Sequence, residues 1–202
     1  MPEYFYADRL FKALERSEPA PGMLLVAAPG MLAPEFARAV VLIIEQDADG
    51  TLGVVLNRRS DIAVQNVMPE WDGLIAPPQA LYIGGPVQPQ AAVGVGVTAP
   101  GVNLNGHPHF GRLANRLVQI NLGAEPEELQ SELEGMRVFA GYSGWDAGQL
   151  DEEIERGDWF VAPALPSDVI APATADLWGE VMRRQVMPLP LFATFPASLE
   201  DN

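Results

Sequence analysis

The sequence predicts one domain in which β-strands and α-helices are mixed along the chain. Residues 136–164 contain an apolar run, a glycine-rich turn, a helix with start and stop signals, and a second apolar run. With 202 residues, of which 48% are hydrophobic, the chain can bury a sizeable core. It shows no internal repeat and no low-complexity linker, so a single domain over 1–202 is expected.

The beginning of the chain predicts a helix followed by a strand. Tyr6, Leu10 and Leu14 are spaced at helical intervals and share one face. Residues 1–21 are therefore expected to form a helical N-terminal extension that docks on the domain. A cluster of proline and glycine ends this extension, and the continuous apolar run 23–28 is expected to be a buried strand.

Two β-branched runs, 39–46 and 51–57, predict a hairpin. The segment between them ends at Gly50, which can take the positive φ that a short turn requires. The serine and aspartate at 60–61 are expected to cap a short helix that ends before Pro69.

The middle of the chain predicts three further strands and a longer helix. The apolar runs 81–85, 91–99 and 117–121 are expected to be strands, with a polar loop over 103–111. The segment 124–135 has a proline and acidic residues where a helix would begin and a glycine where it would end. It is therefore expected to be helical.

Glycines punctuate the most distinctive block of the chain. Gly141 and Gly144 are expected to turn the chain after the first strand. Asp146 and Gln149 have the spacing of a capping box, and Gly157 is expected to end the helix before the second strand.

The C-terminal part predicts a helix and an apolar tail. Leu177 and Val181 share one face of a helix over 173–185. The tail 186–202 is too apolar and too rich in proline to be a free polar segment. It is expected to pack on the domain, or against a partner, through Leu189, Leu191, Phe192 and Phe195.

Charge and composition limit the partners and the location. The chain has 12 Lys plus Arg against 27 Asp plus Glu, a net charge of −15, which repels phosphate backbones, so nucleic acid is not an expected partner. No apolar run approaches the length of about 18 residues that spans a bilayer. The charged N-terminus does not resemble a secretory signal. A cytoplasmic protein without a membrane partner is expected.

The sequence contains no complete catalytic or metal-binding motif. Zero cysteines exclude disulfides and thiolate chemistry. The segment Gly141–Gly144 fails as a nucleophile elbow, because its second glycine comes one residue too early. A hydrolase mechanism would need one of the only two histidines, His107 and His109. A metal site would need these histidines together with distant carboxylates such as Glu70 and Asp72. No catalytic residue, metal ligand or cofactor is assigned.

Three turns carry the candidate ligand-binding residues. An amide and a guanidinium at one strand end suit a carboxylate or a phosphate. A glycine pair after another strand can bring backbone amides close to a ligand. Two aromatic residues beside the third turn can line a shallow pocket. The candidate set is Asn57, Arg58, Gly84, Gly85, Tyr142 and Trp145.

Four motifs together resemble the YqgE/AlgH family of bacterial proteins. They are GMLLVAAPGM at 22–31, LGVVLNRRS at 52–60, LYIGGPVQ at 81–88 and GYSGWDAGQLDEEIERGDWFVAP at 141–163. The resemblance covers the chain from Gly22 to its C-terminus. It implies a compact α+β fold in which a small mixed β-sheet, partly closed into a barrel, is surrounded by helices.

The resemblance implies no reaction. Some members of that family are named as transcriptional regulators, but the acidic charge and the lack of a recognisable reading helix do not support this role here. A cysteine-based redox role proposed within the family cannot apply to a chain without cysteine. We therefore expect a non-enzymatic binding or regulatory module that holds a small ligand or a protein partner. The alternative is a hydrolase-like enzyme that uses carboxylates or a loop histidine.

Overall fold

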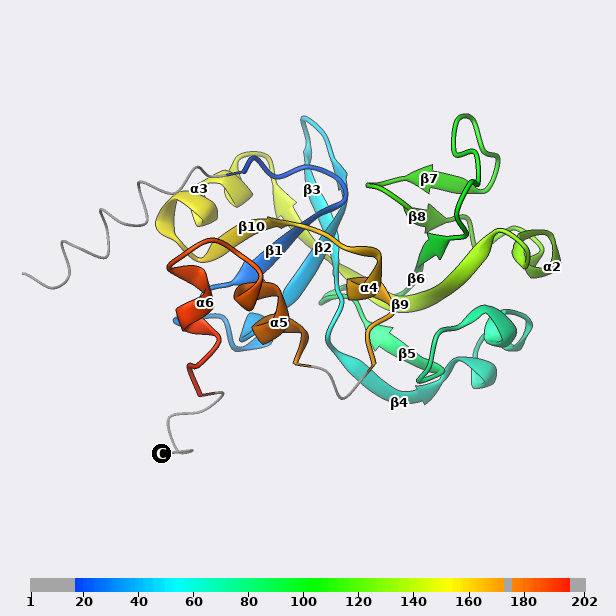
Figure 1. Cartoon of the computed structure of the whole chain (residues 1–202), viewed down its shortest axis with the longest axis horizontal. Helices are drawn as coiled ribbons and strands as arrows, with labels where there is room; N and C mark the ends of the chain where they lie inside the picture. Colours follow the sequence, from blue (N-terminus) through cyan, green and yellow to red (C-terminus); the bar gives the residue numbers. More distant parts are fainter. Residues whose placement is uncertain (1–16, 173–175, 197–202) are drawn as a thin grey trace, which may run out of the picture.

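The computed structural model describes residues 17–172 and 176–196, and a curled β-sheet is its main feature (Figure 1). The helix expected within residues 1–21 lies almost wholly outside these ranges, and so does the end of the tail. The strands are β1 Met23–Ala27, β2 Val40–Gln46, β3 Gly50–Val55, β4 Arg59–Ala63, β5 Ala80–Ile83, β6 Val87–Thr98, β7 Phe110–Arg112, β8 Leu117–Ile120, β9 Leu133–Asp146 and β10 Trp159–Pro163. The helices are α2 Pro126–Leu129, α3 Gln149–Arg156, α4 Pro166–Val169, α5 Leu177–Arg183 and α6 Leu189–Phe192, with 3-10 turns at Pro34–Phe36, Val64–Asn66 and Pro69–Leu74.

The sheet is mixed, as expected. Its main path runs β10-β1-β2-β3-β9-β6-β8-β7 with antiparallel neighbours. On a side branch, β4 pairs with β5, and β5 runs parallel to β9. The curl of the sheet folds it partly around its own inner face (Figure 1).

The expectation that helices surround the sheet was too strong. The described helices are short. In Figure 1, α3, α5 and α6 gather beside β1 and β10, and α2 lies at the opposite end. The curled sheet itself covers much of the core that helices were expected to cover.

The strands β1 and β2 are continuously apolar because both of their faces are buried. Leu24 and Val40 pack in one core cluster, while Leu25 and Val41 pack in a second cluster on the other face. This is the pattern of strands covered on both sides. The predicted hairpin of β2 and β3 is confirmed, with Gly50 at its turn.

The strand β9 connects the two halves of the sheet. Residues 133–142 pair with β6, and residues 143–146 pair with β3. Gly141, at φ +67°, lies where β9 passes from one partner to the other. The expectation that Gly141 and Gly144 turn the chain was therefore wrong, because both lie inside one 14-residue strand.

Two helix predictions were wrong for a related reason. Residues 60–61 belong to β4, where the Ser60 hydroxyl donates to the carbonyl of Leu81 across the strand pair. The helix expected over 124–135 is only α2, because the chain enters β9 at Leu133. In both places, pairing with distant strands determined the backbone conformation, which local helix signals do not report.

Helix α3 ends as predicted but begins differently. Gly157 ends it at φ +87°. Its N-cap is Gly148, and Gln149 accepts from the backbone N–H of Asp146 at 3.0 Å. Only this half of the expected capping box is present.

The C-terminal segment packs through part of its apolar residues. Leu177 and Val181 are buried in α5 as predicted. Leu189 is buried, and the ring of Phe192 stacks on Phe160 with 6.0 Å between ring centres. The side chains of Leu191 and Phe195 remain 55% and 50% exposed, and the ring of Phe195 meets that of Phe192 edge to face with 5.7 Å between ring centres.

A buried guanidinium joins β9 to the loop before β5 and to the end of α4. Arg137 is 1% exposed and lies over the ring of Tyr82, 4.4 Å from the ring centre. Burial lowers the pKa of Arg137, and the nearby phenol of Tyr82 opposes this shift. Its hydrogen bonds, 2.5 to 3.4 Å long, go to the carbonyl oxygens of Pro77, Pro78, Val169 and Ala171.

One carboxylate holds α3 against the sheet. The indole N–H groups of Trp145 and Trp159 both donate to the same Oε2 atom of Glu153, each at 2.8 Å. The amide of Gln149 donates to the other oxygen at 2.9 Å. The two indole rings meet edge to face with their centres 5.8 Å apart. The helix is therefore attached to both β9 and β10.

We expect Arg137→Met to lower the free energy of unfolding by about 3–5 kcal/mol, because buried carbonyls would lose a charged donor. Urea unfolding measures the change. The matched control is Arg112→Met, at an exposed position on β7, which should stay within about 0.5 kcal/mol of the wild type. Equal unfolding midpoints for the two variants would show that water replaces Arg137 at its carbonyls without cost.

We expect Glu153→Ala to cost about 2 kcal/mol of stability, because two buried indole donors lose their acceptor. Tryptophan emission should move to longer wavelength as the indoles gain water. Glu152→Ala is the control, since it changes the same residue type at the exposed neighbouring position of α3. A loss of stability of the same size in both variants would contradict a specific role for the carboxylate of Glu153.

Candidate functional site

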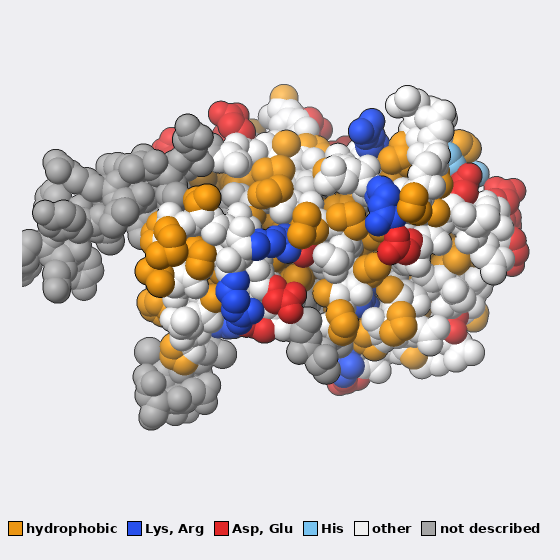
Figure 2. Space-filling model, in the orientation of Figure 1, with side chains coloured by type: hydrophobic (Ala, Val, Ile, Leu, Met, Phe, Trp, Pro, Cys, Tyr) orange, Lys and Arg blue, Asp and Glu red, His pale blue; other side chains and the backbone are white. Residues whose placement is uncertain are grey.

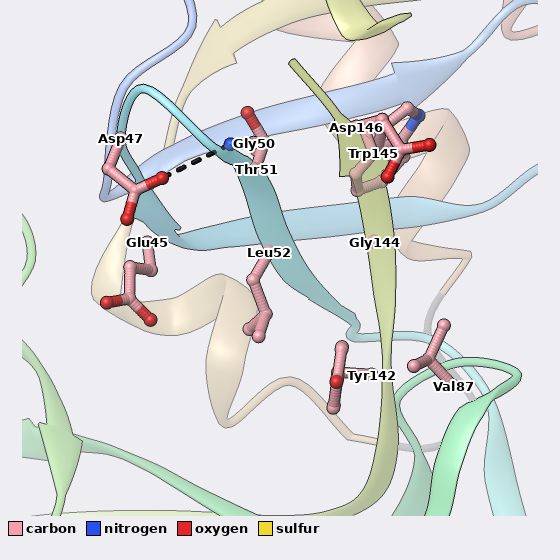
Figure 3. A pocket seen from close by; sticks show the side chains of 10 residues that line it. All are labelled: Glu45, Asp47, Gly50, Thr51, Leu52, Val87, Tyr142, Gly144, Trp145 and Asp146. Carbon is pink, nitrogen blue, oxygen red and sulfur yellow. Dashed lines mark hydrogen bonds between the residues drawn. The ribbon is translucent and has the colours of Figure 1, made fainter.

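A groove lies where the β2–β3 hairpin meets the end of β9 (Figure 3). Its volume is about 350 Å³. We call it the Tyr142 groove, and the residues that line it are Glu45, Asp47, Gly50, Thr51, Leu52, Val87, Tyr142, Gly144, Trp145 and Asp146.

Strand alternation and a glycine keep the floor of the Tyr142 groove open. Tyr142, Gly144 and Asp146 are alternate residues of β9 and face one side of it. Leu52 of β3 lies directly opposite Gly144. A Cβ at Gly144 would lie 3.8 Å from the Tyr142 ring and 3.9 Å from a methyl of Val87, which are ordinary contact distances. The space above this glycine is therefore unfilled and can accept a side chain.

The rim of the groove is acidic. The carboxylates of Glu45, Asp47 and Asp146 are exposed, and the lining contains no lysine, arginine or histidine. One oxygen of Asp47 accepts from the backbone N–H groups of Asp49 and Gly50, at 2.8 and 3.1 Å, which holds the hairpin turn in place. Carboxylates gathered along a concave surface produce a negative potential that attracts cations.

Two of the three acidic side chains lie apart from the apolar ones, whereas Glu45 lies beside Leu52, its partner in the β2–β3 pairing (Figure 3). In Figure 3, Leu52, Val87 and Tyr142 lie at one end, and Asp47 and Asp146 lie toward the other. The Tyr142 side chain is half-buried, so part of its ring is available to a ligand. The arrangement suits a ligand with both a charged and an apolar part.

Trp145 contributes to the groove in a different way from Tyr142. Its side chain is only 5% exposed, points to the opposite side of β9 and donates to Glu153. It also packs against Phe36 and Trp159. Trp145 therefore borders the groove while its indole belongs to the core beneath α3.

The predicted glycine pair lies against the backbone of β9 behind Tyr142. The Gly84 N–H donates to Ala140 at 2.9 Å, and the Gly84 carbonyl accepts from Val55 and from the Ser143 hydroxyl. A Cβ at Gly85 would collide with the carbonyl group of Tyr142. These glycines allow two backbones to approach closely, and the amide of Gly84 is already used.

The predicted residues Asn57 and Arg58 lie outside the Tyr142 groove. The Asn57 side chain donates to the Arg38 carbonyl at 2.8 Å and accepts from the Val40 N–H at 3.0 Å. The carbonyl of Arg58 accepts from the N–H of Ile83 at 2.8 Å. Asn57 lines a separate, smaller cavity together with Arg59 and other residues.

Sequence reasoning missed the acidic rim. Asp47 had a local signal, because an aspartate three residues before a turn glycine commonly accepts from the turn backbone. Glu45 and Asp146 had none, since they approach each other only through the pairing of β2, β3 and β9.

The residues needed for the hydrolase alternative do not meet within the described part of the chain. Ser143 is fully buried, and its hydroxyl donates to Gly84 at 3.1 Å. The ring nitrogen Nε2 of His107 lies 3.0 Å from a carboxylate oxygen of Glu132, and that of His109 lies 3.3 Å from one of Glu128. Over residues 17–172 and 176–196, no three histidine or carboxylate groups are arranged to hold a metal ion.

The surface shows both signs of charge. On the face in Figure 2, arginine side chains are interspersed with acidic and apolar ones and form no continuous basic stripe. Among the described helices, none has the length and apolar character needed to cross a membrane.

Comparison with known proteins identifies close relatives. UPF0301 protein CE2927 of Corynebacterium efficiens is 61% identical over 198 residues, which cover 98% of each chain. UPF0301 protein Rv0038 of Mycobacterium tuberculosis is 51% identical over 181 residues, or 90% of each chain. The crystal structure of protein DIP2367 from Corynebacterium diphtheriae matches with a TM-score of 0.90 and 62% identity, covering 94% of this chain and 100% of that one.

A more distant structure supports the fold alone. The solution structure of the AlgH protein from Pseudomonas aeruginosa matches with a TM-score of 0.61 and 23% identity, covering 91% of this chain and 98% of that one. A family model described as AlgH-like matches residues 24–190. The chain therefore belongs to the AlgH-like family, the YqgE/AlgH family that its four sequence motifs resemble.

Proposed function

We propose that this protein is a non-enzymatic binding or regulatory module whose Tyr142 groove holds a positively charged group, such as a guanidinium or an ammonium. The observation that carries the proposal is the composition of the groove. Exposed carboxylates of Glu45, Asp47 and Asp146 surround a floor left open by Gly144, and no cationic side chain lines it. An incoming cation would therefore meet acceptors without displacing an ion pair in the lining.

The size of the groove supports a small ligand group. Its volume of about 350 Å³ is near the lower end of the range for small-molecule sites, about 300–1,000 Å³. It can accept one basic side chain of a partner protein or a small organic amine. Both present the same charged group to the rim.

The available interactions predict modest affinity. A cation over the partly exposed ring of Tyr142 gains about 0.5–1 kcal/mol, and each exposed carboxylate contributes about 0.2–1 kcal/mol. Apolar contact with Leu52 and Val87 adds to this. The cation–π and carboxylate terms alone sum to about 1–4 kcal/mol, which corresponds to a Kd of about 1 mM or weaker for a small probe, and the apolar contact tightens it.

The side chains of the groove favour binding over catalysis. Its carboxylates are exposed, whereas a carboxyl group that acts as a general acid at neutral pH is usually buried. The nearby hydroxyl of Ser143 lies on the opposite side of β9 and is bonded to Gly84. Neither His107 nor His109 lines the groove.

We expect N-acetyl-L-argininamide, whose only charge is its guanidinium, to bind the Tyr142 groove, and its uncharged counterpart N-acetyl-L-citrullinamide to bind at least ten times more weakly. NMR titration of the ¹⁵N-labelled protein should shift the backbone amides of Gly50, Gly144 and Asp146. Gly144→Leu should weaken argininamide binding at least tenfold, because the new side chain occupies the open floor.

The matched control is Gly111→Leu, on the exposed strand β7, where an added Cβ also meets only ordinary contacts, 3.6 Å away. It should bind argininamide like the wild type. Equal binding of both amides, or full binding by a correctly folded Gly144→Leu variant, would refute the proposal.

A further inference from the structure

A second cavity has the opposite electrostatic character. Its volume is about 40 Å³, and it lies between the end of β3, the β4–β5 pair and the start of α5. We call it the Tyr82 cavity, and its lining residues are Leu56, Asn57, Arg59, Tyr82, Ala171, Pro172 and Leu177. No acidic side chain lines it among the described residues, although the chain as a whole carries a net charge of −15.

The hydroxyl of Tyr82 is buried without a hydrogen-bond partner among the described residues. Tyr82 is 3% exposed, and its oxygen makes no hydrogen bond of ordinary geometry. Leaving a buried hydroxyl unpaired costs about 1–3 kcal/mol. Folded proteins usually satisfy such a group with a bound water or ligand. Tyr82 lines the cavity, so a group bound there would lie against its side chain.

A buried cation lies against the same tyrosine. The Arg137 guanidinium is over the Tyr82 ring, and all of its described hydrogen bonds go to neutral carbonyl oxygens. Within the described residues no carboxylate pairs with it. A buried positive charge that is solvated only by dipoles favours an anion nearby.

The same cation sets the polarity of the hydroxyl. The Arg137 guanidinium lies 4.4 Å from the centre of the Tyr82 ring, and the charge and hydrogen-bonding interaction of the phenol with it raises the pKa of Arg137 against the larger lowering by burial, although no hydrogen bond of ordinary geometry joins the two groups. Because the oxygen lone pairs are attracted to the cation, the hydroxyl hydrogen is left to donate elsewhere. A negatively charged acceptor fits this position.

The guanidinium of Arg59 borders the cavity itself. Arg59 is exposed and lies opposite Tyr82 in the register of β4 and β5. It makes no ion pair within the described part of the chain. The Asn57 side chain is held by backbone groups and shapes the wall. The cavity thus combines the buried hydroxyl donor of Tyr82 with the exposed guanidinium of Arg59, which makes no ion pair among the described residues.

We propose that the Tyr82 cavity binds one carboxylate group, which accepts a hydrogen bond from the Tyr82 hydroxyl and pairs with the Arg59 guanidinium. The volume supports this choice, because about 40 Å³ exceeds the roughly 10–15 Å³ needed for a single water and suits a planar carboxylate better than a tetrahedral phosphate. This site is separate from the Tyr142 groove and does not rest on the function proposed for that groove.

Acetate is the first probe, with acetamide as its uncharged counterpart and sodium chloride as the reference for ionic strength. Acetate should shift the backbone amides around the Tyr82 cavity in NMR spectra, and acetamide should not. N-acetyldiglycine and its C-terminal amide then distinguish a chain end from a small free acid. Binding of acetate alone would assign the site to small acids, and binding of the free-acid peptide as well would assign it also to chain ends.

Tyr82→Phe separates ligand binding from structure. It removes the hydroxyl and keeps the ring beneath Arg137, so the ligand-free variant should be as stable as the wild type or more stable. Its acetate Kd should rise at least tenfold. Arg59→Gln, at an exposed position, should raise the Kd at least threefold, and Arg112→Gln should leave it unchanged.

Two results would overturn the proposal. The first is an unchanged acetate response in Tyr82→Phe and in Arg59→Gln. The second is the absence of any acetate-specific shift in the wild type, which would leave water as the occupant of the cavity. Neither result bears on the argininamide titration of the Tyr142 groove, so the two proposals can fail independently.

Discussion

The pairing of β9 with strands from both halves of the sheet is the constraint on which the rest of the structure depends. One end of this strand completes the ladder of β6 and the other end completes that of β3. Arg137 adds a polar tie at its centre, since its guanidinium gathers carbonyls from the loop before β5 and from the end of α4 with the residues that follow it. A planar group with several fixed donors can satisfy several carbonyls at once, which lysine cannot do in the same geometry.

The close packing of the Gly84–Gly85 backbone against β9 determines where the groove lies. Gly141 bends β9, and a Cβ there would lie 2.7 Å from the carbonyl oxygen of Gly85. Gly84 and Gly85 in turn lie directly on the backbone of β9. Tyr142 follows the bend immediately, so its direction depends on contacts that only glycine permits. The glycines act on the groove through geometry, and the side chains around it determine its chemistry.

The Tyr142 groove and the Tyr82 cavity are lined by charges of opposite sign. Carboxylates border the Tyr142 groove, whereas the Tyr82 cavity is lined by the exposed guanidinium of Arg59 and by Tyr82, whose ring contacts the buried guanidinium of Arg137. The chain has a net charge of −15, so a groove lined by acidic side chains is what its composition predicts. A cavity that has no acidic side chain among its described lining residues differs from that average. Local potential depends on which side chains converge, and net charge alone does not predict it.

Local patterns along the chain predicted the apolar strands, the hairpin at Gly50, the end of α3 at Gly157 and the family, because each depends on residues that are close together in the chain. Tyr142 and Trp145 both border the groove, although the Trp145 indole belongs to the core. That residues 60–61 and Leu133 lie in strands follows from long-range packing, because ladder partners from distant segments outweigh local helix signals.

The tertiary structure likewise separated Asn57 from Tyr142 and brought Glu45 to the end of β9. Side-chain convergence depends on strand register, and a shift of one residue would turn each of these groups to the opposite face. Register across strands far apart in sequence is a property of the packed core. Residue types and local spacing therefore predicted the elements of this protein, and the packing of those elements decided which side chains share a site.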